Sequence, residues 1–107
     1  DNNIIFKNSI QKPLPKNLEK TLYKIIYELI NNTIKHSDSK IIKVQLDYTE
    51  EMLLLKYTDD GRGFDISNVK HGLGLNSIEN RSKSLNGEYE FVSNPGEGMS
   101  YRLKIGF

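Results

Sequence analysis

The sequence contains no cysteine and no tryptophan, and only three of its 107 residues are proline. Without cysteine there is no disulfide framework, no thiolate metal site and no cysteine nucleophile, so nothing indicates an oxidising compartment. The longest apolar run is four residues, Met52 to Leu55, and no charged lead followed by an apolar stretch opens the chain. We therefore expect a cytoplasmic domain with no membrane span and no signal peptide, in a full-length protein whose membrane anchoring stays open.

The chain also lacks an excess of charge of either sign. Fifteen Lys and Arg residues balance fourteen Asp and Glu residues, and no block of like charge interrupts their mixture. Proteins that bind nucleic acid or membrane surfaces concentrate basic residues on one face, so this composition argues against both partners. A length of 107 residues with 36% hydrophobic content predicts one domain with one core, spanning residues 1–107.

Hydrophobic periodicity predicts two helices and five strands. Apolar residues recur at helical spacing over about 16–36 and 75–85, and they alternate over 3–10, 40–48, 52–59, 88–94 and 99–106. Two pairs of strands have connections too short for a crossover and are therefore expected to be antiparallel. They are 40–48 with 52–59, and 88–94 with 99–106. The order predicts an α+β fold, a two-layer α/β sandwich in which a mixed sheet of about five strands carries both helices on one face.

Glycine is confined to the second half of the chain. All eight glycines follow residue 60, and the run Gly72-Leu73-Gly74-Leu75 opens the second helix. Free N–H groups and the helix dipole favour an anion there, although two glycines before a helix are also common in plain loops. No Gly-Lys-Ser/Thr is present for a P-loop, and Ser77 replaces the third glycine of a dinucleotide fingerprint. A phosphate would therefore bind in another way.

The first helix brings an acid, an amide and a base to one arc. Glu28, Asn32 and Lys35 fall within about 60° of one another at 100° per residue. Ordinary pairing on a solvated helix flank explains each charged residue singly. It does not explain Asn32, which projects close to the direction of Ile25 and so would be partly buried and in need of partners. A metal ion is one candidate partner.

The segment Asp59-Asp60-Gly61-Arg62-Gly63-Phe64 follows directly on a strand. A turn explains Asp60 and Gly61. Asp59 is different, because it takes the inward side of an otherwise apolar strand, where an unpaired carboxylate is costly. An acid in this place needs a donor, such as the amine of a base.

In this order and spacing, these segments resemble the ATP-binding catalytic domain of bacterial sensor histidine kinases. That domain has the Bergerat fold of the GHKL superfamily, which also holds DNA gyrase, the ninety-kilodalton heat-shock chaperones and the mismatch-repair ATPases. Residues 28–36 look like the N box, 59–63 the first glycine box, 72–75 the second and 96–98 the last glycine motif. The resemblance runs from about Leu14 to Ile105. The short connection from Gly63 to Gly72 is similar to the ATP lids of the subfamily with nitrate and lipid-fluidity sensors.

The resemblance implies ATP and Mg²⁺ as cofactors, held at the matching positions. Asp59 would accept the adenine amine, and Asn32 would hold Mg²⁺ between the phosphates. Glu28 would act as a base or orienter of the acceptor. The phosphates would be bound by Lys35 and by the backbone of Gly72, Leu73, Gly74 and Leu75. Gly61 and Gly63 would let the backbone pass close to the nucleotide. One departure is Met99, which stands where the family commonly has a threonine with its hydroxyl near the adenine.

The implied reaction is transfer of the γ-phosphate to a histidine on a separate dimerisation domain, with a response regulator downstream. Neither His36, inside the N box, nor His71, in the lid, looks like that acceptor, and the isolated domain is expected to be monomeric. Two alternatives are an anti-sigma-type serine kinase and a non-catalytic nucleotide-binding module. The short lid argues against the first alternative and Glu28 against the second.

Overall fold

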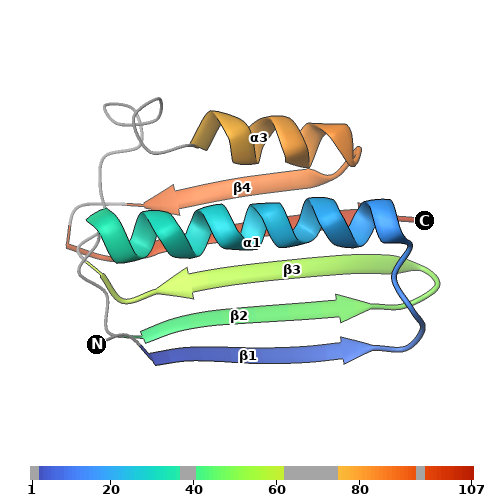
Figure 1. The fold of residues 1–107 in the computed structure, drawn as a ribbon, viewed down its shortest axis with the longest axis horizontal. Helices are drawn as coiled ribbons and strands as arrows, with labels where there is room; N and C mark the ends of the chain where they lie inside the picture. The colour runs from blue at the N-terminus through green and yellow to red at the C-terminus, as the bar shows by residue number, and fades with distance from the viewer. Residues whose placement is uncertain (1–2, 37–40, 62–74, 94–95) are drawn as a thin grey trace.

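The computed structural model describes residues 3–36, 41–61, 75–93 and 96–107, and the rest of the chain lies outside the described part. Five strands and two helices follow one another in the predicted order (Figure 1). Their bounds are β1 Asn3–Ile10, α1 Lys16–His36, β2 Ile41–Tyr48, β3 Met52–Asp59, α3 Leu75–Ser84, β4 Glu88–Ser93 and β5 Met99–Gly106. The predicted elements are confirmed to within a residue or two at each end.

The strands form one sheet in the order β1-β2-β3-β5-β4. The β1 and β2 strands pair in parallel, and every other neighbouring pair is antiparallel. Both helices lie on the same face of the sheet (Figure 1). This arrangement confirms the two-layer α+β fold with a mixed sheet.

The core lies between the helices and that face of the sheet. Alternate residues of β2, β3 and β5 point inward, and the helices contribute one stripe each. The buried apolar residues are Leu22, Ile25, Leu29, Ile42, Val44, Leu46, Tyr48, Leu53, Leu55, Tyr57, Leu75, Ile78, Met99, Tyr101, Leu103 and Ile105. Each fully buried Leu or Ile contributes roughly 1.5–3 kcal/mol through the hydrophobic effect. The fold therefore rests on this single layer of side chains.

Local signals set the ends of the helices. The N–H of Glu19 donates to the Pro15 carbonyl at 2.9 Å, so α1 begins directly after a proline, which fits a first helical turn. After α3 the backbone of Asn86 turns left-handed, with φ 56°, and the Gly87 N–H returns to the Ser82 carbonyl at 3.3 Å. This closure satisfies carbonyls at the helix end.

Several elements begin or end at one end of the sheet, on the left in Figure 1. There α1 and β3 end, and α3 and β5 begin. Asp59 at the end of β3 is paired with Met99 at the start of β5. The last turns of α1, which carry Asn32 and Lys35, reach the same end. No helix within the described ranges is both long enough and apolar enough to cross a membrane.

Candidate functional site

Asp59 is held from two sides at the end of β3. Its Oδ2 accepts a hydrogen bond from the Thr33 hydroxyl of α1 at 3.0 Å, and its Oδ1 accepts the backbone N–H of Gly61 at 2.9 Å. The side chain is partly buried, on the same side of β3 as Leu55 and Tyr57. The predicted inward acid is therefore present, and donors of the protein itself already hold it.

Two buried hydroxyl groups lie behind this carboxylate. The Thr33 hydroxyl and the Tyr57 hydroxyl are hydrogen-bonded to one another, and they lie 3.0 Å and 3.3 Å from the carbonyl oxygen of Leu29. Burial raises the pKa of the Tyr57 phenol well above its ordinary value. Tyr57 is therefore a neutral donor at physiological pH.

Sequence reasoning missed both residues as parts of the site. In the sequence Thr33 falls at helical spacing within the apolar stripe of the first helix, and Tyr57 takes the inward side of an apolar strand, so the pattern assigns both to the core. Their polar atoms were the available signal, because a hydroxyl at a buried position needs a partner. Which partner it finds depends on how α1 crosses β3, and this is set by the tertiary packing.

Asn32 is buried as predicted, with 7% of its surface exposed. Its Nδ2 has no hydrogen-bond partner among the described residues. A buried amide N–H group without a partner is costly, so it points to a ligand that supplies an acceptor, such as a phosphate oxygen. Asn32 precedes Thr33, whose hydroxyl donates to Asp59. The Asn32 amide oxygen suits Mg²⁺, which prefers hard oxygen ligands and is often held by few protein groups together with phosphates and water. In the described ranges, no group of three or more His, Cys, Asp or Glu residues could hold a metal ion.

Glu28 lies one helical turn before Asn32 and is partly buried. Residues four apart share a helix face, so its carboxylate is on the face that carries the Asn32 amide. Glu28 makes no ion pair or hydrogen bond with any described side chain. Lys35 belongs to the last turn of α1, but its side chain lies outside what the structure describes.

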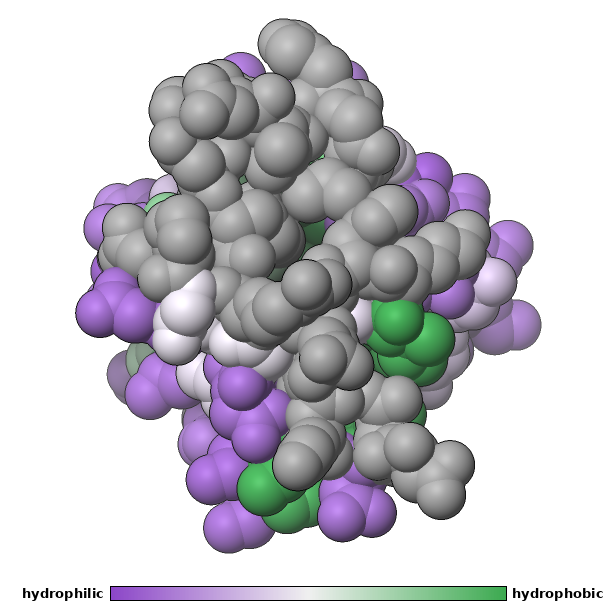
Figure 2. All heavy atoms as spheres, turned by 90° about the vertical axis from the view of Figure 1, so that its left-hand side faces the viewer, coloured by the Kyte–Doolittle hydropathy of each residue, from purple (hydrophilic) through white to green (hydrophobic). Residues whose placement is uncertain are grey.

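The start of β5 closes the site on the other side. Gly98 has φ +77°, and a β-carbon built on it would overlap the carbonyl oxygen of Asp59. Gly61 is buried, and Met99 is 3% exposed with its side chain on the inner face, as predicted. A cavity of about 250 Å³ opens here, lined by Thr58, Asp59, Val92, Glu97, Gly98, Met99 and Ser100. Figure 2 looks onto this end of the molecule, where both hydrophilic and apolar described residues reach the surface.

The predicted phosphate-binding backbone falls largely outside the described residues. This holds for Gly63 in the first glycine box, for Gly72, Leu73 and Gly74 in the second, and for the lid between them with His71. Leu75 begins α3, and its side chain is 1% exposed in the core. The predicted role of Leu75 belongs to its backbone, which leaves this side chain free to pack.

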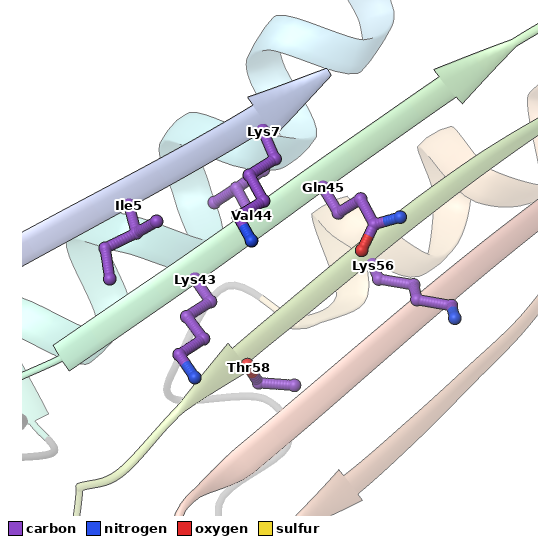
Figure 3. Close-up of a pocket in the computed structure, with 7 residues that line it drawn as sticks. All are labelled: Ile5, Lys7, Lys43, Val44, Gln45, Lys56 and Thr58. Carbon is purple, nitrogen blue, oxygen red and sulfur yellow. The ribbon is translucent and has the colours of Figure 1, made fainter. Parts of the chain in front are cut away.

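A second cavity, of about 310 Å³, lies on the face of the sheet that the helices leave open (Figure 3). It is lined by Ile5, Lys7, Lys43, Val44, Gln45, Lys56 and Thr58. Thr58 precedes Asp59 in β3, and successive side chains of a strand point to opposite faces. Thr58 also lines the cavity of about 250 Å³ next to Asp59, so the two cavities share this one residue.

Residues 17–107 match the family described as histidine kinase-, DNA gyrase B- and HSP90-like ATPases. The sensor histidine kinase LiaS of Bacillus subtilis is 33% identical over 76 residues, which are 70% of this chain and 21% of LiaS. The sensor protein VraS of Staphylococcus saprophyticus is 33% identical over 75 residues, 69% of this chain and 22% of VraS. The chain thus spans about a fifth of the length of these relatives.

Solved structures support the same fold. The blue-light activated histidine kinase of Erythrobacter litoralis EL346 superimposes with a TM-score of 0.76 and 17% sequence identity, covering 96% of this chain and 35% of that protein. The histidine kinase domain of the same protein gives a TM-score of 0.71 and 20% identity, covering 96% of this chain and 51% of that domain structure. With the family match over most of its length, the chain belongs to the histidine kinase-, DNA gyrase B- and HSP90-like ATPase family.

Proposed function

We propose that this domain binds Mg-ATP at the end of the sheet and transfers the γ-phosphate to a histidine on a separate dimerisation domain. The observation that carries the proposal is the Asp59 carboxylate, which Thr33 and Gly61 hold from two sides, together with the buried Asn32 next to Thr33 on α1, whose Nδ2 has no partner among the described residues. A fixed carboxylate can accept the exocyclic amine of adenine. The Asn32 amide and the Glu28 carboxylate, which lie one helical turn apart on α1, would face the phosphates.

The roles of the helix residues follow from their places. The Asn32 oxygen would hold Mg²⁺ together with the phosphates, where the ion would neutralise charge on the transferring group. Glu28, on the same helix face and without a partner among the described side chains, would orient or deprotonate the acceptor imidazole. Lys35 and the backbone of Gly72 to Leu75 would neutralise phosphate charge.

The partners of the whole protein are part of the same proposal. The relatives LiaS and VraS are named a sensor histidine kinase and a sensor protein. We infer that the full-length protein adds a dimerisation domain with the acceptor histidine and passes the phosphate to a response regulator. The catalytic domain itself would lie in the cytoplasm, where ATP is available.

Calorimetric titration tests the nucleotide assignment directly. The 107-residue chain should bind one ATP in the presence of Mg²⁺ and should bind GTP much more weakly. The reason is that GTP presents a carbonyl oxygen to the Asp59 carboxylate where ATP presents an amine. Equal affinity for the two nucleotides contradicts the adenine assignment.

A further inference from the structure

The hydroxyl groups of Tyr57 and Thr33 form a chain that ends on the Asp59 carboxylate. Thr33 Oγ1 lies 3.0 Å from Asp59 Oδ2, and the Tyr57 hydroxyl is hydrogen-bonded to the same Oγ1. Only 2% of Thr33 and 0% of Tyr57 is exposed. The chain therefore joins the body of β3, the helix above it and the carboxylate at the end of the strand, with no water between them.

The direction of this chain follows from the groups that compose it. Each hydroxyl carries one proton to donate, and a carboxylate can only accept. A hydrogen bond to a charged group is stronger than one to a neutral carbonyl, so the Thr33 proton is directed to Asp59 rather than to the carbonyl of Leu29. The Tyr57 hydroxyl then donates its proton to Thr33 Oγ1.

Asp59 is thereby fixed in rotation as well as in position. Thr33 donates to Oδ2 and the Gly61 N–H donates to Oδ1, so turning the carboxylate breaks at least one of the two bonds. Across the ladder between β3 and β5, Asp59 pairs with Met99, whose thioether has no proton to donate. The hydroxyl that orients the carboxylate comes from the helix side instead.

We propose that Thr33 and Tyr57 are positioning residues for base recognition: they hold the Asp59 carboxylate in the orientation in which it accepts the amine of adenine. The inference rests on the proposed nucleotide site and adds two residues to it. They act through Asp59 and do not touch the base. Removing either hydroxyl should therefore weaken the binding of ATP more than that of GTP. GTP has no amine at this position for the oriented carboxylate to accept.

The test is a set of calorimetric titrations with Mg-ATP and Mg-GTP. Thr33→Val keeps the shape of the side chain and removes its hydroxyl. We expect it to weaken ATP binding about three- to tenfold and to lower the ATP-to-GTP affinity ratio by a similar factor. Tyr57→Phe should act in the same direction by about two- to fivefold, and Thr33→Ser should stay within about twofold of the parent chain because it keeps the donor.

The chain offers a matched control for each variant. Thr21 is also on α1, and its hydroxyl donates to the carbonyl four residues earlier, at 3.1 Å, so Thr21→Val removes a comparable helix bond far from Asp59. Tyr101 lies on β5, where its buried hydroxyl pairs with Ser82, so Tyr101→Phe repeats the tyrosine change in a second buried pair. Both controls should leave the ATP-to-GTP ratio unchanged.

The outcomes separate this inference from the proposed function. If Asp59→Asn leaves ATP affinity unchanged, the adenine assignment itself fails. If Asp59→Asn weakens ATP but Thr33→Val behaves like Thr21→Val, the positioning role is overturned and the nucleotide site stands. If Thr33→Val loses ATP and GTP affinity equally, the variant has damaged the site as a whole, and the positioning role is also overturned. Should Thr33→Val fail to fold, the ratio measured for Tyr57→Phe against Tyr101→Phe decides the matter.

Discussion

Gly98 lies directly against the backbone of Asp59. A β-carbon on Gly98 would overlap the Asp59 carbonyl oxygen and lie 3.2 Å from its carbonyl carbon. The close approach brings the start of β5 onto the residue that we assign to adenine. The glycine is therefore needed for the geometry of the site itself.

Gly98→Ala should lower both stability and ATP affinity. The left-handed backbone, with φ +77°, costs a non-glycine residue about 1–3 kcal/mol, and the overlap with Asp59 adds to this cost. Gly96→Ala is the control, because Gly96 has a similar φ of +83° but nothing within 4 Å of its β-carbon. Urea unfolding should show the larger loss for Gly98→Ala, and equal losses would mean that the contact with Asp59 is unimportant.

Asp59→Asn should weaken ATP binding by about 1.5–3 kcal/mol, the range for a charge-assisted hydrogen bond replaced by a mismatched donor. The Thr33 hydroxyl and the Gly61 N–H both donate to this side chain, so an amide NH₂ would also face one of them. Calorimetry with ATP measures the loss. An asparagine variant that binds ATP as tightly as the parent chain would remove Asp59 from the site.

Asn32→Ala should remove the Mg²⁺ dependence of ATP affinity and leave the fold intact. Its Nδ2 has no hydrogen-bond partner in the part of the chain that the structure describes, so truncation breaks no described bond of that atom. Asn31, which points about 100° away on the helix, provides the control. Titrations with and without Mg²⁺ should converge for Asn32→Ala and stay apart for Asn31→Ala, and the reverse pattern would show that the register of the metal ligand is wrong.

Stability should fall in alkali because two buried tyrosines resist ionisation. Burial raises the pKa of Tyr101 to about 12, and it raises that of Tyr57 as well. In the unfolded chain tyrosine ionises near pH 10, so the stability present below about pH 10 is lost as pH rises to 12. For Tyr101 the loss is on the order of 2–3 kcal/mol at 1.36 kcal/mol per pKa unit. Urea unfolding at pH 8, 10 and 11 should show a shallower decline for Tyr101→Phe than for the parent chain, and parallel declines would contradict the assignment.

Glu28→Gln should slow phosphate transfer far more than it weakens ATP binding, since the carboxylate is proposed to act in the transition state. Glu19 is also partly buried on α1 but lies in the first turn, at the other end of the helix, so Glu19→Gln is the matched control. Single-turnover transfer and calorimetry separate the two effects. Normal transfer by Glu28→Gln would contradict the catalytic role of Glu28.

The fold was predictable from the sequence because each helix and most strands have a hydrophobic pattern that is visible within the element itself. The apolar stripe of 16–36 and the alternation of 40–48 and 52–59 each lie within one element, and the tight turns between strands fix the antiparallel pairs. The edge position of β1 is different. All eight of its residues are exposed, so alternation in its sequence carries little information about which strand it joins.

The main residues of the site were predictable from the sequence, but the residues that hold Asp59 in place were not. Asp59 and Asn32 stood out because each is a polar residue at a position that the pattern buries. The bond from Thr33 to Asp59 spans 26 positions of the sequence, and the bond from Thr33 to Tyr57 spans 24. Contacts of this kind depend on the register of α1 over β3, which side-chain packing sets and which no local pattern encodes.

Phosphate transfer to a supplied dimerisation domain tests the central claim most directly. The chain would be incubated with ATP that carries radioactive phosphate at the γ position, alone and with its cognate dimerisation domain. We predict no label on the chain itself and strong label on the added domain, lost in acid and stable in alkali, as expected for phosphate on a histidine. Label that survives acid on a serine, or no transfer at all by a chain that binds ATP, would contradict the account.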